Sequence, residues 1–371
     1  MTSPSEHTPQ AASGGSGRRA QVVGVGLIGG SIGLALRGRG WHVTGRDTDS
    51  ELADKALALG ALDAVGDDPE AEIVFLATPV GATAAEATAV FDTSGRRADV
   101  AVTDVGGVKR SVVEELAHPR FVGGHPMAGS EQVGLAGADP ELFVGATWVL
   151  TPTDVTDAGA YARVQAVVGA LGADVVALSP EQHDALVAVV SHVPHLVAAT
   201  LMNAATLGAE QDGALLRLAA GGFRDMTRVA AGDPGIWPDV CAENAPAIVE
   251  TLDALVEALV AVRHQVATAD RAALLGALTS AAEARRALPA RAVRPERLAE
   301  LRVPVPDRPG VLAEITTMAG NLGVNIFDLE IAHSAEGPRG VLVVVVDADM
   351  AGRLGDGLSG RGYRWTARPL G

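Results

Sequence analysis

The first half of the chain is organised around the stretch Gln21-Val22-Val23-Gly24-Val25-Gly26-Leu27-Ile28-Gly29-Gly30-Ser31-Ile32-Gly33. A β-branched run leads into Gly24-x-Gly26-x-x-Gly29 and a helix-favouring segment follows, so we predict a strand, a tight turn and a helix. Glycine permits positive φ in the turn and lets a phosphate approach the backbone. The N–H groups at the start of the helix can then bind a pyrophosphate. The stretch therefore predicts the first βαβ unit of a dinucleotide-binding domain.

The segment after this helix supports that interpretation, since a lone glycine pattern is weak evidence in a chain with 44 glycines. Residues 41–45 read as a second strand, and Asp47 follows about 20 residues after the glycines, where an acid binds the ribose hydroxyls of NAD. The alternative is a turn residue at a strand end. Asp47 would repel the 2′-phosphate of NADP, whereas Arg46 could stack on adenine or attract that phosphate. We predict NAD, rather than NADP, with these contact residues: Gly24, Gly26, Leu27, Ile28, Gly29, Asp47, Thr78 and Asp104.

Length and composition limit the class of protein. The chain has 371 residues, which is too long for one ordinary core, so we expect two or three domains. With 45 acidic and 29 basic residues the formal net charge is −16, which argues against nucleic acid as a partner. An anionic substrate would therefore need local arginines. A single cysteine, Cys241, excludes a disulfide framework and fits the reducing cytoplasm.

Neither a signal peptide nor a membrane span is expected. Residues 1–18 are rich in Ser, Gly and Pro and have no apolar segment of signal-peptide type, so we predict a disordered tail. The most apolar stretch, residues 185–202, is interrupted by polar residues and by Pro194, which argues against a transmembrane helix.

Strands and helices alternate up to residue 179. We expect strands at 73–77, 99–104, 121–124, 147–150 and 174–177, and helices at 51–59, 80–90 and 158–171. The predicted fold class is α/β, with a Rossmann-type doubly wound sheet over residues 19–179. Ligands bind beyond the carboxyl ends of the strands in such sheets, so the segments after Ala77, Thr103 and Gly124 are the ones to search.

Two further regions follow this domain. Residues 180–290 show helical spacing of apolar residues over 181–207, 239–262 and 271–288, and several of these helices are apolar nearly all round. We expect an all-helical domain buried on more than one side and forming a homodimer interface, and then a linker at 291–299. In residues 300–371 a strand at 301–305, a helix at 311–321, strands from 324 and at 340–346 and a helix from 351 predict a ferredoxin-like α+β domain.

His125 is the first candidate for chemistry. It follows a predicted strand on the cofactor side of the sheet, in His125-Pro126-Met127-Ala128-Gly129-Ser130-Glu131. A histidine there can take a proton while a neighbouring carbon loses hydride, since its ordinary pKa lies near working pH. The alternative is a loop histidine that packs on Pro126.

Six motifs match one known family. They lie at 26–31 (GLIGGS), 103–109 (TDVGGVK), 123–131 (GGHPMAGSE), 190–195 (VSHVPH), 221–228 (GGFRDMTR) and 233–237 (DPGIW). With them the chain resembles, over almost everything after residue 20, the prephenate dehydrogenases of tyrosine biosynthesis in their form with a C-terminal ACT domain.

The resemblance implies a substrate and a reaction. The substrate is a cyclohexadiene with a hydroxyl on one ring carbon and a carboxylate on the opposite one. His125 matches the histidine that accepts the hydroxyl proton while hydride passes to NAD, and loss of CO2 makes the ring aromatic. Arg228 matches the arginine that binds a substrate carboxylate, a role suited to its rigid fork of donors. Without the motif, Arg228 would read as a surface arginine of a helix. No metal is needed.

The same resemblance extends to further pocket positions. His195 matches a second substrate-side histidine, and the pair His192 and His195, one helical turn apart, lacks a third ligand for a metal. His183 matches another family histidine, although a plain helix-surface role is an equal alternative. The other matching positions are Ser130, Arg224, Glu131 and Trp237, of which Trp237 could also be a core aromatic. Many relatives have a serine where Gly107 stands, so its contact must come from Ser130, water or backbone, or be absent.

Residues 306–312 with 324–326 resemble the amino-acid-binding turn of ACT domains. The resemblance implies that tyrosine or phenylalanine binds there, at Asp307, Arg308, Gly310, Val311, Leu312 and Asn325. The alternative is a dimerisation module without a ligand.

Three other functions remain open at this point. An arogenate dehydrogenase performs the same chemistry on a substrate with an amino group in place of the side-chain keto group. A 3-hydroxyacid dehydrogenase is disfavoured by the motif at 123–131, since those enzymes depend on a helix-borne lysine. A catalytically silent amino-acid sensor is disfavoured by the intact His125, Arg228 and glycine turn.

Overall fold

The computed structural model describes residues 17–129, 132, 134–211, 214–287, 298–306, 308–333 and 339–369. The chain divides into two compact units, Met1–Val260 and Ala261–Gly371. The first unit holds a large sheet and most of the helical segment. The second holds the end of that segment and the C-terminal module.

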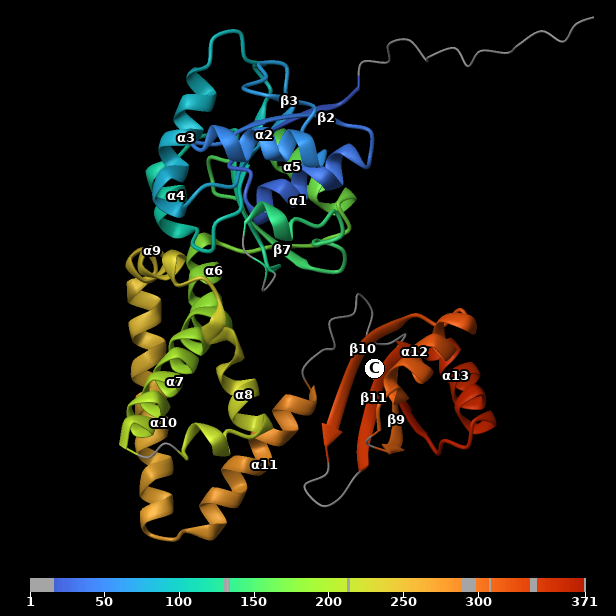
Figure 1. Cartoon of the computed structure of the whole chain (residues 1–371). Helices are drawn as coiled ribbons and strands as arrows, with labels where there is room; N and C mark the ends of the chain where they lie inside the picture. Colours follow the sequence, from blue (N-terminus) through green and yellow to red (C-terminus); the bar gives the residue numbers. More distant parts are fainter. Residues whose placement is uncertain are drawn as a thin grey trace, which may run out of the picture. The chain divides into compact units, whose positions relative to one another are not determined.

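A mixed, mainly parallel sheet forms the first part of the chain (Figure 1). Its order over the described residues is β3-β2-β1-β4-β5-β6-β7-β8. The strands are β1 (Arg19–Val23), β2 (His42–Arg46), β3 (Ala64–Val65), β4 (Ile73–Leu76), β5 (Ala101–Asp104), β6 (Phe121–Pro126), β7 (Thr147–Thr151) and β8 (Asp174–Ala177). Among the described strand pairs of this sheet, β6 and β7 form the single antiparallel pair, and β8 runs parallel to β7. The strand order reverses between β1 and β4, so the predicted doubly wound α/β sheet is confirmed.

Helices cover both faces of this sheet. On one face lie α1 (Leu27–Arg37), α2 (Ser50–Leu59) and α5 (Ala158–Ala170), and on the other α3 (Val80–Asp92) and α4 (Arg110–Glu115). Strand β4 shows why its sequence is apolar without interruption. Ile73 and Phe75 join the core under α1 and α5, while Val74 and Leu76 join the core under α3. A parallel strand buried on both sides reads as such a run.

The helical segment begins with α6 (Pro180–Val187), η2 (Ala188–His192) and α7 (Val193–Gln211), which follow one another directly. The sequence predicts a single α-helix here, but η2 is a π-helical turn in which the N–H of Val193 bonds to the carbonyl of Ala188. Pro194 explains the difference, because it has no N–H to donate to the carbonyl four residues earlier.

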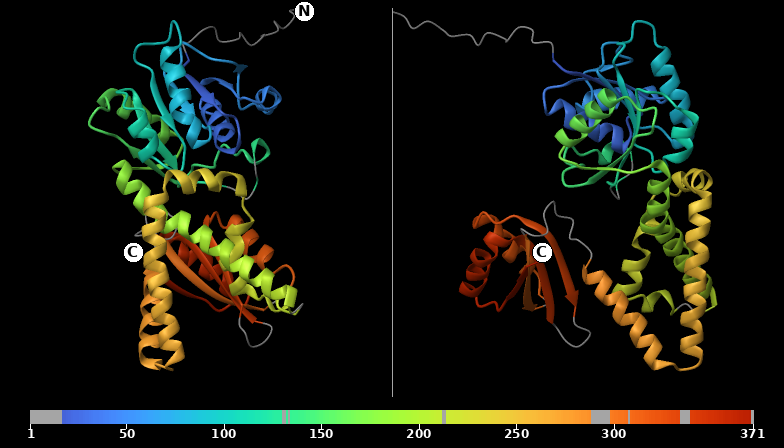
Figure 2. Two further views of the ribbon diagram at one scale, coloured as in Figure 1. Left: turned by 90° about the vertical axis from the view of Figure 1, so that its left-hand side faces the viewer. Right: turned by 180° about the vertical axis from the view of Figure 1, so that it is seen from behind.

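Further helices of the segment are α8 (Gly221–Thr227), η4 (Arg228–Ala231), α9 (Trp237–Glu243), α10 (Ala245–Ala267) and α11 (Arg271–Ala287). Helices α7 and α10 lie side by side (Figure 1, Figure 2), joined by a core that includes Ala188, Val193 and Ile248.

The expected burial of these helices on several sides is not seen within one chain. Large apolar side chains stay more than half exposed, among them Val189, Val190, Leu207, Val256 and Leu259. By length and composition the run Pro180–Ala209 could cross a membrane, and 28% of its most apolar window is buried. The same run carries the buried polar side chains of His183, Asp184 and His192, which bond to the rest of the first unit.

The C-terminal module has the order β-α-β-β-α-β. Its elements are β9 (Leu298–Pro306), α12 (Val311–Asn321), β10 (Ile326–His333), β11 (Arg339–Asp347), α13 (Ala348–Gly360) and β12 (Thr366–Pro369). The strands pair antiparallel in the order β10-β11-β9-β12, and both helices pack on one face of the sheet (Figure 1). This is a ferredoxin-like arrangement.

Two sequence-based boundaries differ from the structure. Strand β9 begins at Leu298, which is 3% exposed and lies within the predicted linker, so that linker is too long at its end. Arg18 was placed in the disordered tail, but its guanidinium lies 4.0 Å from the ring centroid of Trp41. The tail up to residue 16 and the linker residues up to 297 lie outside the described residues.

Candidate active site

The glycine turn between β1 and α1 leaves room for a phosphate. Gly24 has φ +86°, and a Cβ there would collide with the carbonyl oxygen of Ala77. At Gly29 a Cβ would collide with the carbonyl of Gly24. At Gly26, by contrast, a Cβ would meet no described atom within 4 Å. The space next to Gly26 lies at the N-terminus of α1, where Leu27 and Ile28 are half-buried, and fits the pyrophosphate of a dinucleotide.

Asp47 directly follows β2, and its side chain is hydrogen-bonded to the glycine turn. Its Oδ2 accepts a hydrogen bond from the N–H of Val25 at 2.8 Å, and its Oδ1 accepts one from the N–H of Asp49 at 3.0 Å. Arg46 forms ion pairs with two other residues, with Nη2 2.6 Å from Glu86 Oε2 and Nε 3.0 Å from Asp67 Oδ1. The Oγ1 of Thr78 is buried without a hydrogen-bond partner among the described residues, so it is free to bond a ligand.

Asp104 is a predicted cofactor residue whose side chain is bound within the protein. It is fully buried, and its carboxylate forms an ion pair with the ammonium of Lys109. The same carboxylate accepts hydrogen bonds from the N–H groups of Gly106 and Gly124, each at 2.9 Å. Lys109 and these two N–H groups thus engage the carboxylate from within the protein, and the cofactor contact of Asp104 stays a prediction.

His125 is the last residue but one of β6, the other residues of this strand are buried, and its ring contacts a second histidine. Its Nδ1 lies 2.8 Å from Nε2 of His183, and His183 Nδ1 lies 2.7 Å from Asp184 Oδ1. The Asp184 carboxylate also accepts the backbone N–H groups of Lys109 and Arg110, each at 2.9 Å. His183 is fully buried, which excludes the helix-surface alternative for it.

The surroundings of His125 favour its neutral form. Burial is the main cause that holds the pKa of His125 well below its ordinary value of 6.5, and His183, Lys109 and His192 lower it further. A neutral imidazole is the form that can accept a proton.

Asn244 extends this network to His192. The amide nitrogen of Asn244 lies 2.9 Å from the carbonyl oxygen of Asp184 and 3.2 Å from Nδ1 of His192. Burial lowers the pKa of His192 to about 4, so this ring is neutral and accepts the amide hydrogen at Nδ1.

His195 and Trp237 form an aromatic wall. Their rings stack with centroids 3.7 Å apart and planes at 15°, and His192 meets the same indole edge-on at 6.1 Å. Gly232, which follows η4, would place a Cβ 3.9 Å from His195 Cε1, so the segment that begins with Arg228 passes close to His195. Trp237 is half-buried, so it is not a fully buried core aromatic.

The predicted carboxylate-binding arginines are exposed. Arg228 stands at the start of η4, and Arg224 in α8 donates from Nε to the carbonyl oxygen of Ala219 at 3.2 Å. Ser130 and Glu131 lie outside the described residues. Gly107 would direct a Cβ to within 3.9 Å of Nε2 and Cε1 of His125, so a side chain at this position would face the free nitrogen of that histidine.

Three residues that sequence reasoning left out of the site belong to it by contact: Lys109, Asp184 and Asn244. A sequence signal existed only for Lys109, as part of a family motif. His183, which matches a family histidine, also belongs to the site by contact. Within the described residues no three His, Cys, Asp or Glu side chains gather in the manner of a metal site.

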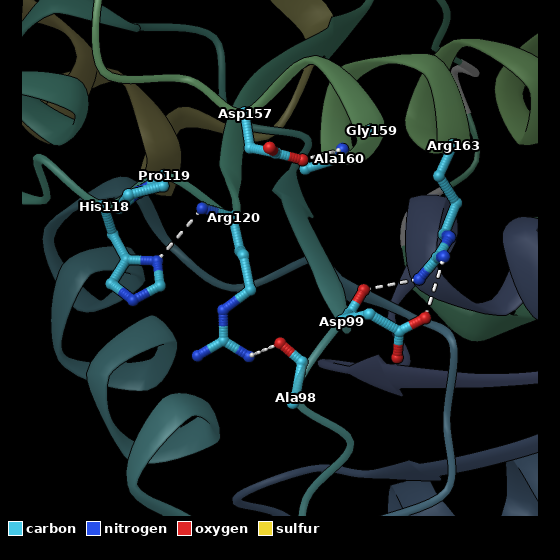
Figure 3. Close-up of a pocket in the computed structure, with 9 residues that line it drawn as sticks. All are labelled: Ala98, Asp99, His118, Pro119, Arg120, Asp157, Gly159, Ala160 and Arg163. Atoms are coloured by element: carbon cyan, nitrogen blue, oxygen red, sulfur yellow. Dashed lines mark hydrogen bonds and ion pairs between the residues drawn. The ribbon is translucent and has the colours of Figure 1, made fainter.

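A separate pocket lies at the opposite ends of the strands (Figure 3). Asp99 and Arg120 precede β5 and β6, so this pocket opens at the amino edge of the sheet. Its charged groups are engaged, with Arg163 Nη2 3.0 Å from Asp99 Oδ2 and Arg120 Nη1 3.1 Å from the carbonyl of Ala98. Because ligands of such sheets bind at the carboxyl edge, we do not assign the cofactor to it.

Of the predicted effector residues, Arg308 and Gly310 precede α12, Val311 and Leu312 begin it, and Asn325 lies between α12 and β10. Gly310 has φ +89°, and Arg308, Leu312 and Asn325 are exposed. The side chain of Val311 is 4% exposed and part of the module's core, so only its backbone could reach a ligand. Asp307 lies outside the described residues.

Two family models match the chain. They are "Prephenate dehydrogenase, nucleotide-binding domain" over residues 32–177 and "Prephenate dehydrogenase, dimerization domain" over residues 179–280. A prephenate dehydrogenase of Bacillus subtilis is 35% identical over 341 residues, which are 88% of this chain and 92% of the relative. A cyclohexadienyl dehydrogenase of Zymomonas mobilis is 35% identical over 280 residues, which are 72% of this chain and 94% of the relative.

Solved structures show the same likeness. The prephenate dehydrogenase of A. aeolicus, in complex with hydroxyphenyl propionate and NAD+, is 31% identical with a TM-score of 0.68, over 74% of this chain and 99% of that one. The arogenate dehydrogenase of Synechocystis is 32% identical with a TM-score of 0.63, over 72% of this chain and 98% of that one.

Proposed function

Because the chain belongs to the prephenate dehydrogenase family, we propose that it converts prephenate to 4-hydroxyphenylpyruvate in tyrosine biosynthesis. It is an NAD-dependent dehydrogenase. The observation that carries the proposal is the position of His125. It is the last residue but one of β6, at the same carboxyl edge of the sheet as the glycine turn, and it bonds through Nδ1 to His183. That bond leaves Nε2 for the substrate.

The residues of the first unit fit NAD. Gly24, Gly26 and Gly29 with the start of α1 would hold the pyrophosphate, and Asp47 would meet the ribose. When bound, NAD supplies the acceptor for the hydride that leaves the substrate's hydroxyl-bearing carbon.

His125 supplies the proton chemistry. Its Nε2 accepts the proton of the substrate hydroxyl as the C–H bond breaks with its electron pair. The bond between the ring and its carboxylate then breaks, CO2 leaves, and that electron pair completes the aromatic ring. The proton returns from Nε2 to the phenol oxygen, so the base is regenerated without net proton release.

The helical segment would hold the substrate. We propose that Arg228 binds a carboxylate of the substrate and that Arg224, Glu131 and Trp237 are further substrate-binding residues. Ser130 and His195 are proposed to act in catalysis together with His125. The stacked pair of His195 and Trp237 offers a flat, apolar surface to a six-membered ring.

One assay tests the function. NADH and NADPH formation should be followed with prephenate and with arogenate in parallel. We expect turnover with prephenate and NAD. Greater efficiency with arogenate would make the chain an arogenate dehydrogenase, the second candidate, which is favoured by the likeness to the Synechocystis enzyme. No turnover with either substrate would support the silent sensor instead.

We also propose a homodimer through the helical segment, in the domain arrangement predicted from the sequence. The exposed apolar side chains of α7 and α10 and the match to a dimerization domain support it. Light scattering after size-exclusion chromatography should give twice the 37.7 kDa chain mass. The single cysteine and the nature of the reaction fit a cytoplasmic enzyme without nucleic-acid or membrane partners.

We propose further that residues 298–369 are an ACT domain that binds tyrosine or phenylalanine and inhibits the enzyme. Support comes from the ferredoxin-like order and from the turn at Gly310, which opens onto the N-terminus of α12. The coupling between the two sites should be about 1–3 kcal/mol.

Calorimetry with tyrosine and phenylalanine on the full chain, and on a truncation ending near Pro295, tests the regulation. The truncated chain should stay active and lose inhibition. Absence of heat with both amino acids on the full chain would leave the module a dimerisation element.

A further inference from the structure

Three side chains form a continuous chain of hydrogen bonds behind the proposed base. Asp184 contacts His183 at 2.7 Å, and His183 contacts His125 at 2.8 Å. His183 lies at the first turn of α6, which Ser179 fixes through a capping box with Gln182. The position of the imidazole of His183 is thus set by the start of its helix.

The partners of Asp184 decide which nitrogen of His183 carries a hydrogen. A carboxylate only accepts, and Asp184 already accepts the N–H groups of Lys109 and Arg110. The Nδ1 of His183 must therefore be the donor in its bond to Asp184. In the neutral ring the Nε2 of His183 is then an acceptor.

The same reasoning applies to the ring of His125. Because His183 Nε2 accepts, the hydrogen in its bond with His125 belongs to Nδ1 of His125. The Nε2 of His125 consequently holds a free lone pair, and it is the nitrogen that faces Gly107, with 3.9 Å to the Cβ position there.

We propose that Asp184 and His183 are positioning residues that hold His125 in its Nδ1–H tautomer, with Nε2 unprotonated and directed at the substrate. The importance of the tautomer for the reaction rests on the proposed function, whereas the tautomer itself does not. When Nε2 takes the proton, His125 becomes a cation whose Nδ1–H still donates to His183, with the charge of Asp184 behind it. The arrangement follows the logic of a base oriented by a second group.

The tautomer can be measured without substrate. Full-length protein labelled with 15N-histidine should show, in two-bond 15N–1H spectra, a protonated Nδ1 and an unprotonated Nε2 for His125. His125→Gln identifies which signals belong to this ring. In His183→Asn, whose amide can still reach Asp184 but not His125, the His125 signals should shift toward the Nε2–H form. A wild-type His125 protonated at Nε2, or a doubly protonated His183, would overturn the proposal.

Kinetics of two His183 variants provide the second measurement. A glutamine at 183 can put an acceptor where Nε2 stood, and an asparagine cannot. We expect His183→Asn to lower kcat by about 10- to 100-fold with little change in KM, and His183→Gln to recover most of that loss. Exposed Glu181→Gln on the same helix is the matched control and should leave kcat unchanged.

These outcomes separate the two levels of the argument. Equal kcat in the Asn and Gln variants, with both folded by circular dichroism, would show that the bond to His125 has no positioning role. The expected 15N pattern in a protein without dehydrogenase activity would contradict the proposed function and leave the tautomer assignment standing.

Discussion

Lys109 and Asp104 form an ion pair in which both side chains are excluded from solvent. Asp104 ends β5, and its carboxylate also receives the N–H of Gly124 at 2.9 Å, one residue before His125. The backbone N–H of Lys109 in turn donates to Asp184 at 2.9 Å. The ion pair and these hydrogen bonds thus connect the loop after β5, which carries Lys109, to β6, which carries His125.

Removing one partner of this pair should destabilise the protein strongly. Asp104→Ala leaves a buried ammonium without its counter-charge, and we expect a loss of about 3–5 kcal/mol in the free energy of unfolding. The first unfolding transition in urea measures this free energy. Glu114→Ala breaks the exposed pair with Arg110 and serves as the control, with an expected loss of about 0.5 kcal/mol or less. Similar losses in both variants would contradict the special role of the buried pair.

Replacing the proposed base should affect turnover and spare binding. His125→Asn retains an amide that can donate to His183 but has no nitrogen in place of Nε2. We expect kcat to fall by ~10²–10⁴-fold, with KM values close to those of the wild type. Initial rates of NADH formation measure both constants. Wild-type turnover in this variant would assign the proton transfer to another group.

Much of the fold follows from local patterns in the sequence. The helix predicted at 311–321 is observed with those bounds, because its apolar spacing and the flanking glycines are local signals. Strand β4 was equally readable from its apolar run. The π-helical turn and fourth strand of the C-terminal module were missed, since one depends on a single missing N–H and the other on pairing with β9.

Site residues could be predicted from the sequence only where a local motif identifies them. His125 and the glycine turn are recognisable from their position after strands. The contact between His125 and His183 depends on how α6 packs against the sheet, which no local pattern reports. The ion pair between Asp104 and Lys109 could not be predicted for the same reason, because the fold of the loop that brings Lys109 back to Asp104 is a tertiary feature.

The pH dependence of turnover should reflect the lowered pKa of His125. The base is active when neutral, so kcat/KM falls as the pH decreases through its pKa. Since burial, His183, Lys109 and His192 hold this pKa below 6.5, the decline should lie below that pH. Profiles of kcat/KM from about pH 5 to about pH 9 measure it. A decline centred above 6.5 would show that His125 is not buried in this way in the working enzyme.

Arg228 should matter for affinity more than for the chemical step. Arg228→Ala removes a charge-assisted contact to a carboxylate, worth roughly 1.5–3 kcal/mol, so KM for prephenate should rise by about 10- to 100-fold. Lysine should restore part of the affinity, since it lacks the bidentate fork. Arg217→Ala, at another exposed arginine of the helical segment, is the control. An unchanged KM in Arg228→Ala would mean that another group holds the carboxylate.

The preference for NAD should depend on where Arg46 is held. Its guanidinium is engaged by Glu86 at 2.6 Å and Asp67 at 3.0 Å, so it is not available to a 2′-phosphate. Asp47 would repel that phosphate as well. We therefore expect higher kcat/KM with NAD than with NADP in the wild type, and little change from Glu86→Gln alone.

The double variant Asp47→Ser with Glu86→Gln should narrow this preference. It removes the repelling carboxylate and one of the two ion pairs that hold Arg46, so that Nη2 can turn to the phosphate. One new hydrogen bond from a charged donor corresponds to roughly 10- to 100-fold in kcat/KM with NADP. Asp47→Ser alone separates the loss of repulsion from the loss of the Glu86 ion pair. If NADP is already the better cofactor of the wild type, or if the double variant gains no more than Asp47→Ser, the ion pair between Arg46 and Glu86 does not govern the choice of cofactor.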